Sequence, residues 1–328
     1  MKKILKYLIG LIIILIFTYY GAGFYVAYQI LKIDYTCGLH EGSLPNTWST
    51  SVDAFEYNDY SQRELRENFK YENYYLDEWQ DVYFSSRDQG IKINGWLFNY
   101  FPKRPIIIVT HGINPNGKCK SESNLVASLL VSKKFNVLTI DLRNYGQSDK
   151  TSKYDDLGLK SYNDILGAFD FLTNIGFKSN NIGLHGISLG ASTSIFAASN
   201  EPKILAIWSD SPIAEFKMAL KDEIARYGLS IEFGPAVSFA GRFLTGIDPT
   251  LLSPAFKLSS TQSYFFTHGD NDTRVLTRHF KYFKEFTSNN NINAQFWLAK
   301  DSNHVDAMLK YPNEYADKME LFFNSNLK

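Results

Sequence analysis

The chain has few cysteines, no excess of either charge and no histidine cluster, and each absence excludes a class of partner or site. Its 34 basic residues balance 34 acidic ones, which argues against a nucleic-acid partner and favours a small or uncharged substrate. The two cysteines, Cys37 and Cys119, are too few for a disulfide framework, and their spacing leaves open whether they pair. Neither has metal-ligand spacing with a second cysteine or histidine, and the six histidines are scattered, so we expect no metal and no cofactor. Internal repeats and low-complexity tracts are also absent.

Charge is missing altogether from Tyr7 to Leu31. About twenty apolar residues cross the hydrocarbon core of a bilayer, so this segment predicts one N-terminal transmembrane helix. Lys2, Lys3 and Lys6 precede it, and only Lys32 follows closely. This asymmetry predicts a single-pass protein of the cell membrane, with a cytoplasmic N-terminus and the bulk of the chain on the extracytoplasmic side.

Two alternatives to a membrane anchor are a cleaved signal peptide, with Gly21-Ala22-Gly23 at the cleavage region, and a buried structural helix. Apolar residues continue past Gly23, which favours the uncleaved anchor. The second half of the segment is rich in aromatic residues, as an interfacial belt would be. These aromatic residues are Tyr19, Tyr20, Phe24, Tyr25 and Tyr28.

We expect three parts along the chain: a membrane anchor over 1–33, a polar and aromatic stem over 34–78 that partly packs on the domain, and a folded domain over 79–328. The stem contains one possible short helix around 61–71. Within the domain, residues 210–261 predict a helical insertion. It either covers the carboxyl ends of the strands, where ligands bind, or packs on the edge of the sheet.

From residue 81 onward, short β-rich runs alternate with amphipathic helical segments. Residues 81–85 and 91–98 predict two antiparallel strands joined by a turn. The runs 106–109, 136–140 and 204–208 are apolar almost throughout, which is typical of parallel strands covered on both faces. The pattern predicts an α/β domain.

A serine stands between two glycines in the stretch Gly186-Ile187-Ser188-Leu189-Gly190, after a predicted strand and before a predicted small-residue helix. A serine acts as a nucleophile only if its hydroxyl stands clear of the backbone, and a sharp strand-to-helix turn achieves this. Such a turn leaves no room for side chains on Gly186 or Gly190. The pattern therefore predicts a nucleophile elbow centred on Ser188.

A nucleophilic serine needs a base, and the base needs an acid that fixes its tautomer. Asp270 and Asp272 follow the predicted strand 263–267, and His304 follows the predicted strand 294–298. Serine, acid and histidine at the ends of successive strands give the chain order expected of α/β hydrolases.

Stabilising the oxyanion requires backbone N–H groups. Leu189, directly after the serine, is one expected donor, and Ile113, in the loop after the strand 106–109, is the other. His111 in the same loop is a second candidate base, but a histidine–glycine pair at a strand end also fits loop shaping, and His304 occupies the expected place in the chain order.

These motifs together resemble those of serine hydrolases of the α/β-hydrolase superfamily, from about Trp79 to the C-terminus. The resemblance is closest to a bacterial membrane-anchored subgroup with serine aminopeptidase-like and acyl-hydrolase-like members. It implies a mostly parallel eight-stranded sheet with helices on both faces and a short helical cap. The motifs that carry it are Val109-Thr110-His111-Gly112, the stretch 141–148, the stretch 186–190, His268-Gly269-Asp270-Asn271-Asp272 and Asn303-His304.

The family pattern places the acid three residues after the glycine of His-Gly, which selects Asp272 and makes Asp270 a turn residue; Asp301 is a third candidate. It also implies a structural role for Asp141 and Arg143. The chain departs from the pattern at Thr273-Arg274-Val275, which lacks a following proline, and at Ala191, where a second glycine is frequent. Neither departure removes a reacting group.

The sequence thus predicts a membrane-anchored serine hydrolase that cleaves an ester, thioester or amide through an acyl-enzyme on Ser188, with a carboxylesterase or acyl hydrolase favoured. Its expected substrate is a small or lipid-like acyl compound. The alternatives are a serine exopeptidase on the same triad and a non-enzymatic hydrolase-like binding protein. A serine at the elbow argues against epoxide hydrolases and haloalkane dehalogenases, which carry an aspartate there.

Overall fold

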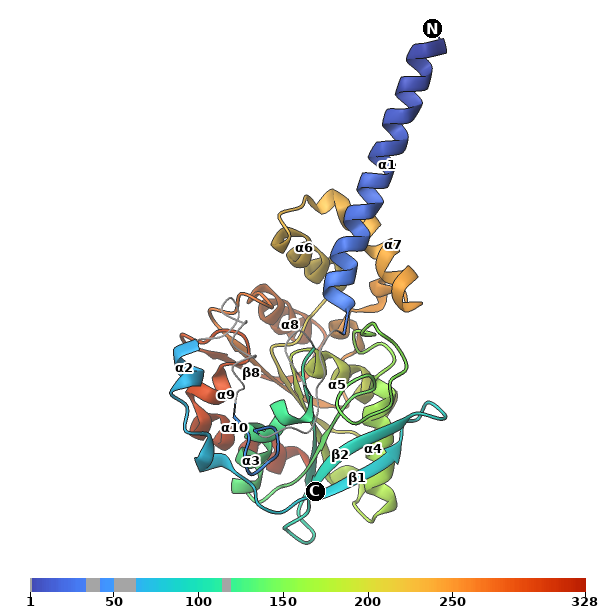
Figure 1. The fold of residues 1–328 in the computed structure, drawn as a ribbon. Coiled ribbons are helices and arrows are strands. Elements are labelled where there is room, and N and C mark those ends of the chain that lie inside the picture. Colours follow the sequence, from blue (N-terminus) through green and yellow to red (C-terminus); the bar gives the residue numbers. More distant parts are fainter. Residues whose placement is uncertain (1, 34–41, 50–62, 114–118) are drawn as a thin grey trace.

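The computed structural model describes residues 2–33, 42–49, 63–113 and 119–328. Cys37 lies outside these residues, as do 34–41 and 50–62 of the expected stem. The described part is one mixed sheet covered by helices, with a single long helix, α1 (Lys2–Leu31), projecting from it (Figure 1).

Eight strands form the sheet in the order β1-β2-β4-β3-β5-β6-β7-β8. Only β2 runs antiparallel to its neighbours, and the other adjacent pairs are parallel. This confirms the predicted mostly parallel eight-stranded α/β-hydrolase fold. The strands are β1 (Gln80–Ser85), β2 (Lys92–Phe98), β3 (Ile106–Thr110), β4 (Asn136–Ile140), β5 (Ile182–Ile187), β6 (Ala206–Asp210), β7 (Ser263–Gly269) and β8 (Asn293–Ala299).

The central strands β3 to β6 are buried at every position, which explains why their sequences are apolar almost throughout. Successive side chains alternate between two cores: Ile107 and Val109 join one, and Ile106 and Ile108 join the other. The strand expected at 204–208 begins two residues later, because its pairing with β7 starts at Ala206.

Helices cover both faces of the sheet. The core on one face includes residues of α3 and α10, and the core on the other includes residues of α4, α5 and α8. The bounds are α2 (Arg63–Glu67), α3 (Asn124–Ser132), α4 (Tyr162–Asn174), α5 (Leu189–Asn200), α8 (Arg278–Asn289), α9 (Ala307–Lys310) and α10 (Pro312–Asn326). Two stem residues, Trp48 and Tyr71, are buried in the first of these cores.

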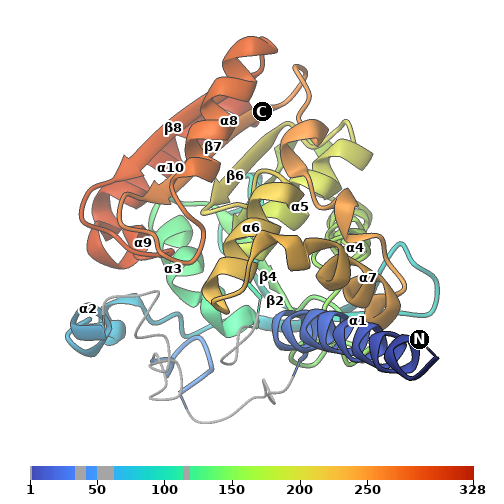
Figure 2. The same cartoon turned by 90° about the horizontal axis from the view of Figure 1, so that it is seen from above.

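The insertion between β6 and β7 carries two helices, α6 (Phe216–Arg226) and α7 (Gly234–Thr245). Gly228 follows α6 with a φ of 68°, a conformation that favours glycine and ends the helix. Both helices flank the lower end of α1, and α7 lies beside α1 in both views (Figures 1 and 2).

The C-terminal end of α1 is joined to the domain by backbone hydrogen bonds. Lys32 pairs with Tyr154 in an isolated β-bridge. The N–H of Ile33 donates to the carbonyl of Lys153 at 3.0 Å, and that of Asp155 donates to the carbonyl of Leu31 at 2.8 Å. These two hydrogen bonds of the bridge set the direction in which α1 leaves the domain.

Candidate active site

Ser188 occupies a sharp turn between β5 and α5. Its φ of 53° and ψ of −113° lie outside the regions that most residues adopt. Both flanking glycines are required by space: a Cβ on Gly186 would lie 2.3 Å from the carbonyl oxygen of Gly190, and a Cβ on Gly190 would lie 2.4 Å from that of His111. The strained turn lifts the Ser188 side chain clear of the sheet.

His304 connects Ser188 to Asp272. Its Nε2 lies 2.9 Å from the Ser188 Oγ, and its Nδ1 lies 2.8 Å from the Asp272 Oδ2. Because a carboxylate only accepts, Nδ1 carries the proton, and Nε2 is left to accept from the serine hydroxyl. The three residues come from the ends of β5, β7 and β8, and parallel strands bring those ends to the same edge.

Asp272 is held in the ionised form. Burial by itself would raise its pKa, but the neighbouring His304, its hydrogen bond, and further contributions from His268 and the Val275 N–H outweigh burial and lower the pKa. The other carboxylate oxygen, Oδ1, accepts from the N–H groups of Arg274 and Val275, each at 2.8 Å. One oxygen therefore fixes the loop and the other orients His304.

The alternative acids make other contacts. Asp270 lies in the turn directly after β7, and its carboxylate accepts from the N–H of Ser302, in the loop after β8, at 3.2 Å. Asp301 is exposed, with a φ of 48°. Of the three candidate acids, Asp272 alone is hydrogen-bonded to His304 among the described residues.

His111 is turned away from the serine. Its Nδ1 lies 2.8 Å from the carbonyl of Gly112 and its Nε2 accepts from the N–H of Leu142 at 3.1 Å. Burial lowers the pKa of this ring. Both nitrogens are used in holding the loop after β3.

The loop after β3 passes directly against the nucleophile, since a Cβ on Gly112 would lie 3.2 Å from the Cβ of Ser188. Ile113, the next residue, lines the same cavity as Ser188 and Leu189. Leu189 is the first residue of α5, so its N–H has no partner within the helix. A contact absent from the sequence analysis stabilises the loop: the Gly112 N–H donates to the Glu122 carboxylate at 2.7 Å.

A buried polar group behind the elbow also escaped sequence reasoning. The carbonyl of Asp210 accepts the N–H of Ser188 at 2.7 Å, and its carboxylate accepts from the Tyr315 hydroxyl at 2.8 Å. Tyr315 in turn accepts from Trp208 Nε1 at 3.0 Å and contacts His185 Nε2 at 2.8 Å. Burial raises the pKa of Asp210 to about 6 and lowers that of His185 to about 3. The one feature of the sequence that could have pointed to Asp210 is its position at the end of a predicted strand.

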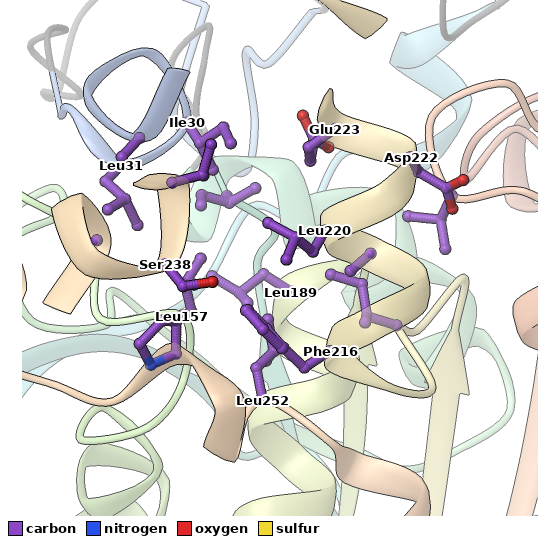
Figure 3. A pocket seen from close by; sticks show the side chains of 18 of the residues that line it. Ile30, Leu31, Leu157, Leu189, Phe216, Leu220, Asp222, Glu223, Ser238 and Leu252 are labelled. Atoms are coloured by element: carbon purple, nitrogen blue, oxygen red, sulfur yellow. The ribbon is translucent and has the colours of Figure 1, made fainter. Parts of the chain in front are cut away.

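Ser188 opens into an apolar cavity of about 900 Å³, counting the space at its open side. Leu189, Phe216 and Leu252 converge on it from three different elements (Figure 3). The insertion therefore covers the carboxyl ends of the strands, the first of the two arrangements considered from sequence. Ile30 and Leu31 of α1 also line the cavity.

The two acidic residues of α6 at the cavity are paired with arginines. Glu223 forms an ion pair with Arg274, and Asp222 forms one with Arg278. Asp222 also lies 3.1 Å from His279 Nε2, and burial lowers the pKa of that histidine to about 4. These contacts connect the cap to the loop that carries Asp272. Within the described ranges, no group of three or more His, Cys, Asp or Glu residues is arranged to hold a metal ion.

Comparison with curated proteins finds partial matches. An acyltransferase of Aspergillus calidoustus is 26% identical over 136 residues, which are 41% of this chain and 43% of that protein. A thiohydrolase of Aspergillus aculeatus is 28% identical over 138 residues, 42% of each. The chain thus spans about half the length of the curated relatives it matches.

Solved structures share the fold. An esterase of Pyrococcus furiosus superposes with a TM-score of 0.61 at 22% identity, over 76% of this chain and 94% of the esterase. An acylaminoacyl peptidase of Pyrococcus horikoshii superposes with a TM-score of 0.59 at 19% identity, over 76% of this chain and 42% of the peptidase.

The sequence profile of the prolyl oligopeptidase family matches residues 121–328, a segment that includes Ser188, Asp272 and His304. This segment is more than half of the chain, and it contains five of the eight strands of the sheet. The chain therefore belongs to the prolyl oligopeptidase family and has the fold of the α/β-hydrolase superfamily.

Proposed function

We propose that this protein is a membrane-anchored serine hydrolase that cleaves acyl esters through an acyl-enzyme on Ser188. The observation that carries the proposal is the hydrogen-bond chain from Asp272 through His304 to Ser188 at the edge of an apolar cavity. A nucleophile, a base and an orienting acid in this geometry are what acyl transfer requires.

In the proposed reaction, the Ser188 Oγ bonds to the substrate carbonyl carbon while His304 Nε2 takes the hydroxyl proton. The oxyanion accepts hydrogen bonds from the N–H groups of Leu189 and Ile113. The bond to the leaving group then breaks, and His304 returns the proton to the departing alcohol, thiol or amine. A water molecule, deprotonated by His304, attacks the acyl-enzyme and releases the carboxylic acid and the free serine.

The lining of the cavity favours an acyl hydrolase over an exopeptidase. An aminopeptidase needs an unpaired acidic group to bind a free N-terminus, whereas Asp222 and Glu223 are each neutralised by an arginine. The remaining surface is dominated by aliphatic and aromatic side chains, which suit an acyl chain. Among the relatives, the thiohydrolase fits an acyl substrate, whereas the family profile is that of a peptidase, so the cavity lining carries this choice.

We further propose that residues 1–33 anchor the protein in the cell membrane, that 34–78 form a stem, and that 79–328 form the hydrolase domain with a cap over 210–261. Helix α1 is long and apolar enough to cross a bilayer. Lysines at its start favour a cytoplasmic N-terminus and an extracytoplasmic hydrolase domain. Gly23, at the alternative signal-peptide cleavage region, is buried against α7, which favours the uncleaved helix.

The direct test is Ser188→Ala in the purified full chain. We expect the variant to lose p-nitrophenyl butyrate hydrolysis and fluorophosphonate labelling. Ser199→Ala, at the far end of α5, is the matched control and should retain both. Labelling of the Ser188 variant at the wild-type level would refute the proposal. Comparing esters with aminoacyl amides separates an acyl hydrolase from an exopeptidase, and protease accessibility in intact cells tests the orientation.

A further inference from the structure

Helix α1 has two halves with different surroundings. From Lys2 to Thr18 nearly every side chain is exposed, whereas between Tyr19 and Leu31 the helix packs against the cap and buries Val26, Ala27 and Leu31. Figure 1 shows the first half projecting alone and the second half lying between α6 and α7. Only the first half is available to cross a bilayer.

The aromatic residues of the second half pair with the cap. Tyr19 stacks on Phe233 with ring centroids 5.3 Å apart, and Tyr20 and Phe24 contact the Phe239 ring at 5.4 and 6.2 Å. Phe24 also contacts the Phe243 ring at 5.6 Å. Of the five aromatic residues expected to form an interfacial belt, Tyr20 and Phe24 therefore contact α7. The other three contact aromatic rings outside α7: Tyr19 contacts Phe233, Tyr25 contacts Tyr227, and Tyr28 contacts Tyr154.

The outer face of α7 is apolar although it is exposed. Phe239 is 52% exposed and Phe243 is 71% exposed, and the two lie one turn apart beside the exposed residues of α1. Arg242 is exposed between them. Large aromatic side chains with a neighbouring cation are the composition of a helix that lies in a membrane interface.

The length of the free half places this face at the membrane. At 1.5 Å per residue, Lys2–Thr18 is about 25 Å long and its uncharged part, Tyr7–Thr18, is about 18 Å long, so the free half falls well short of the hydrocarbon core of about 30 Å. Glu232 is exposed beside the point where the free half of α1 ends, because its carbonyl accepts from the Tyr19 hydroxyl at 2.9 Å. Once α1 spans the bilayer, Phe239 and Phe243 must therefore lie against its outer surface.

The opposite face of α7 lines the cavity that holds Ser188. Val237, Ser238 and Gly241 line this cavity together with Ile30 and Leu31 of α1. Figure 3 shows Ser238, Ile30 and Leu31 at the cavity. One helix thus separates the apolar outer surface from the nucleophile. Gly23 of α1 packs directly on Ala236 of α7, so an acyl chain would reach the cavity beside this helix pair and not between the two helices.

We propose that α7 docks in the outer membrane interface and that the substrate is a long-chain acyl ester of a bilayer lipid, which enters the Ser188 cavity from the membrane side of the cap. This rests on the proposed function of Ser188. The serine Oγ would bond to the lipid's carbonyl carbon, the ester C–O bond would break, and His304 would pass the serine proton to the deacylated lipid alcohol. Water would then release the fatty acid.

The test uses the full chain in vesicles of dioleoylphosphatidylglycerol containing dioleoylglycerol, with oleate release measured beside p-nitrophenyl butyrate turnover in the same vesicles. For Phe239→Gln/Phe243→Gln we expect oleate release to fall about tenfold and turnover of the soluble ester to change less than about twofold. Leu321→Gln on α10 is the matched control, because Leu321 is 70% exposed, close to the 71% of Phe243. It should leave both activities unchanged.

A wild-type protein that cleaves the soluble ester but releases no oleate would overturn the lipid inference and leave the proposed function intact. So would undiminished oleate release by the double variant, or an equal fall in both activities. Soluble-ester turnover that survives Ser188→Ala would instead refute the proposed function.

A second measurement does not depend on activity. Phe243→Trp and Leu321→Trp report membrane contact through quenching of tryptophan fluorescence by brominated lipids. We expect the substitution on α7 to add quenched fluorescence and the one on α10 to add none. Equal quenching of the two variants would exclude docking of α7.

Discussion

Replacing Asp272 with Asn isolates the contribution of one negative charge to the candidate site. Asp272 makes two kinds of contact: Oδ1 accepts the N–H groups of Arg274 and Val275, and Oδ2 accepts from His304 Nδ1 at 2.8 Å. The amide of Asn keeps one acceptor oxygen for the two backbone groups. Its nitrogen, however, presents a donor to His304, which favours the tautomer with the proton on Nε2.

That tautomer cannot accept the proton of Ser188. The equivalent substitution in a serine–histidine–aspartate triad lowers kcat about 10⁴-fold, which corresponds to roughly 5 kcal/mol of barrier. We expect a loss of about 10³-fold to 10⁴-fold in p-nitrophenyl butyrate turnover by the Asp272→Asn variant. The melting temperature near neutral pH should fall, because the variant lacks the stabilisation that ionised Asp272 provides above the unfolded pKa, although the backbone contacts of Oδ1 remain.

Asp270→Asn and Asp301→Asn are the controls, since neither side chain is hydrogen-bonded to His304 in the described structure. Each should keep turnover within about threefold of the wild type. The reasoning fails if Asp272→Asn retains more than about a tenth of the activity, or if Asp270→Asn loses as much. Acid unfolding adds a check: the depressed pKa of Asp272 means that its ionised form stabilises the fold above the unfolded value of 3.8. This stabilisation is lost as the pH falls through the folded pKa, and the Asn variant should lack it.

Two further predictions concern the fold. Gly23→Leu should lower the free energy of unfolding by about 1–3 kcal/mol, because a Cβ there lies 2.6 Å from the Ala236 backbone. Gly21 faces open space, so Gly21→Leu should leave the free energy of unfolding unchanged. If both variants lowered the melting temperature in detergent equally, the packing of Gly23 against α7 would be contradicted. Burial raises the pKa of Asp155 to about 7, and the charge of Asp156 adds to the shift. The folded state therefore holds a proton that the unfolded state loses, and the free energy of unfolding falls as the pH rises from about 4 to about 7. Asp155→Asn should therefore remove about 3 kcal/mol of the difference between pH 5 and pH 8 in denaturant titrations, and an unchanged pH dependence would argue against a buried, protonated Asp155.

Much of the sheet was predictable because strands buried on both faces consist of short apolar runs. A central strand of a parallel sheet has no polar face, so β3 reads as an apolar run, and β5 can be recognised from the elbow that follows it. Ser188 and His304 were predictable for a related reason. Parallel strands place their carboxyl ends at one edge, so residues that follow successive strands meet there.

The choice between Asp270 and Asp272 required the tertiary structure or a family pattern. Two residues separate them on one loop, and the chemistry of their side chains is the same. The Asp272 carboxylate reaches His304 because its Oδ1 is held by the N–H groups of Arg274 and Val275, and this fixes the direction of Oδ2. Asp210 and Tyr315 were beyond sequence reasoning, since their contact joins residues 105 positions apart.

The sequence alone determined the type of fold and the set of candidate reacting groups, because hydrophobic periodicity and glycine spacing are local properties of the chain. It also marked α1 as a long apolar helix, by length and lack of charge. Only the tertiary structure decided that the second half of α1 packs against α7 and lines the cavity in front of Ser188. Apolar side chains are equally suited to lipid and to protein, so their partner depends on which surfaces the fold brings together.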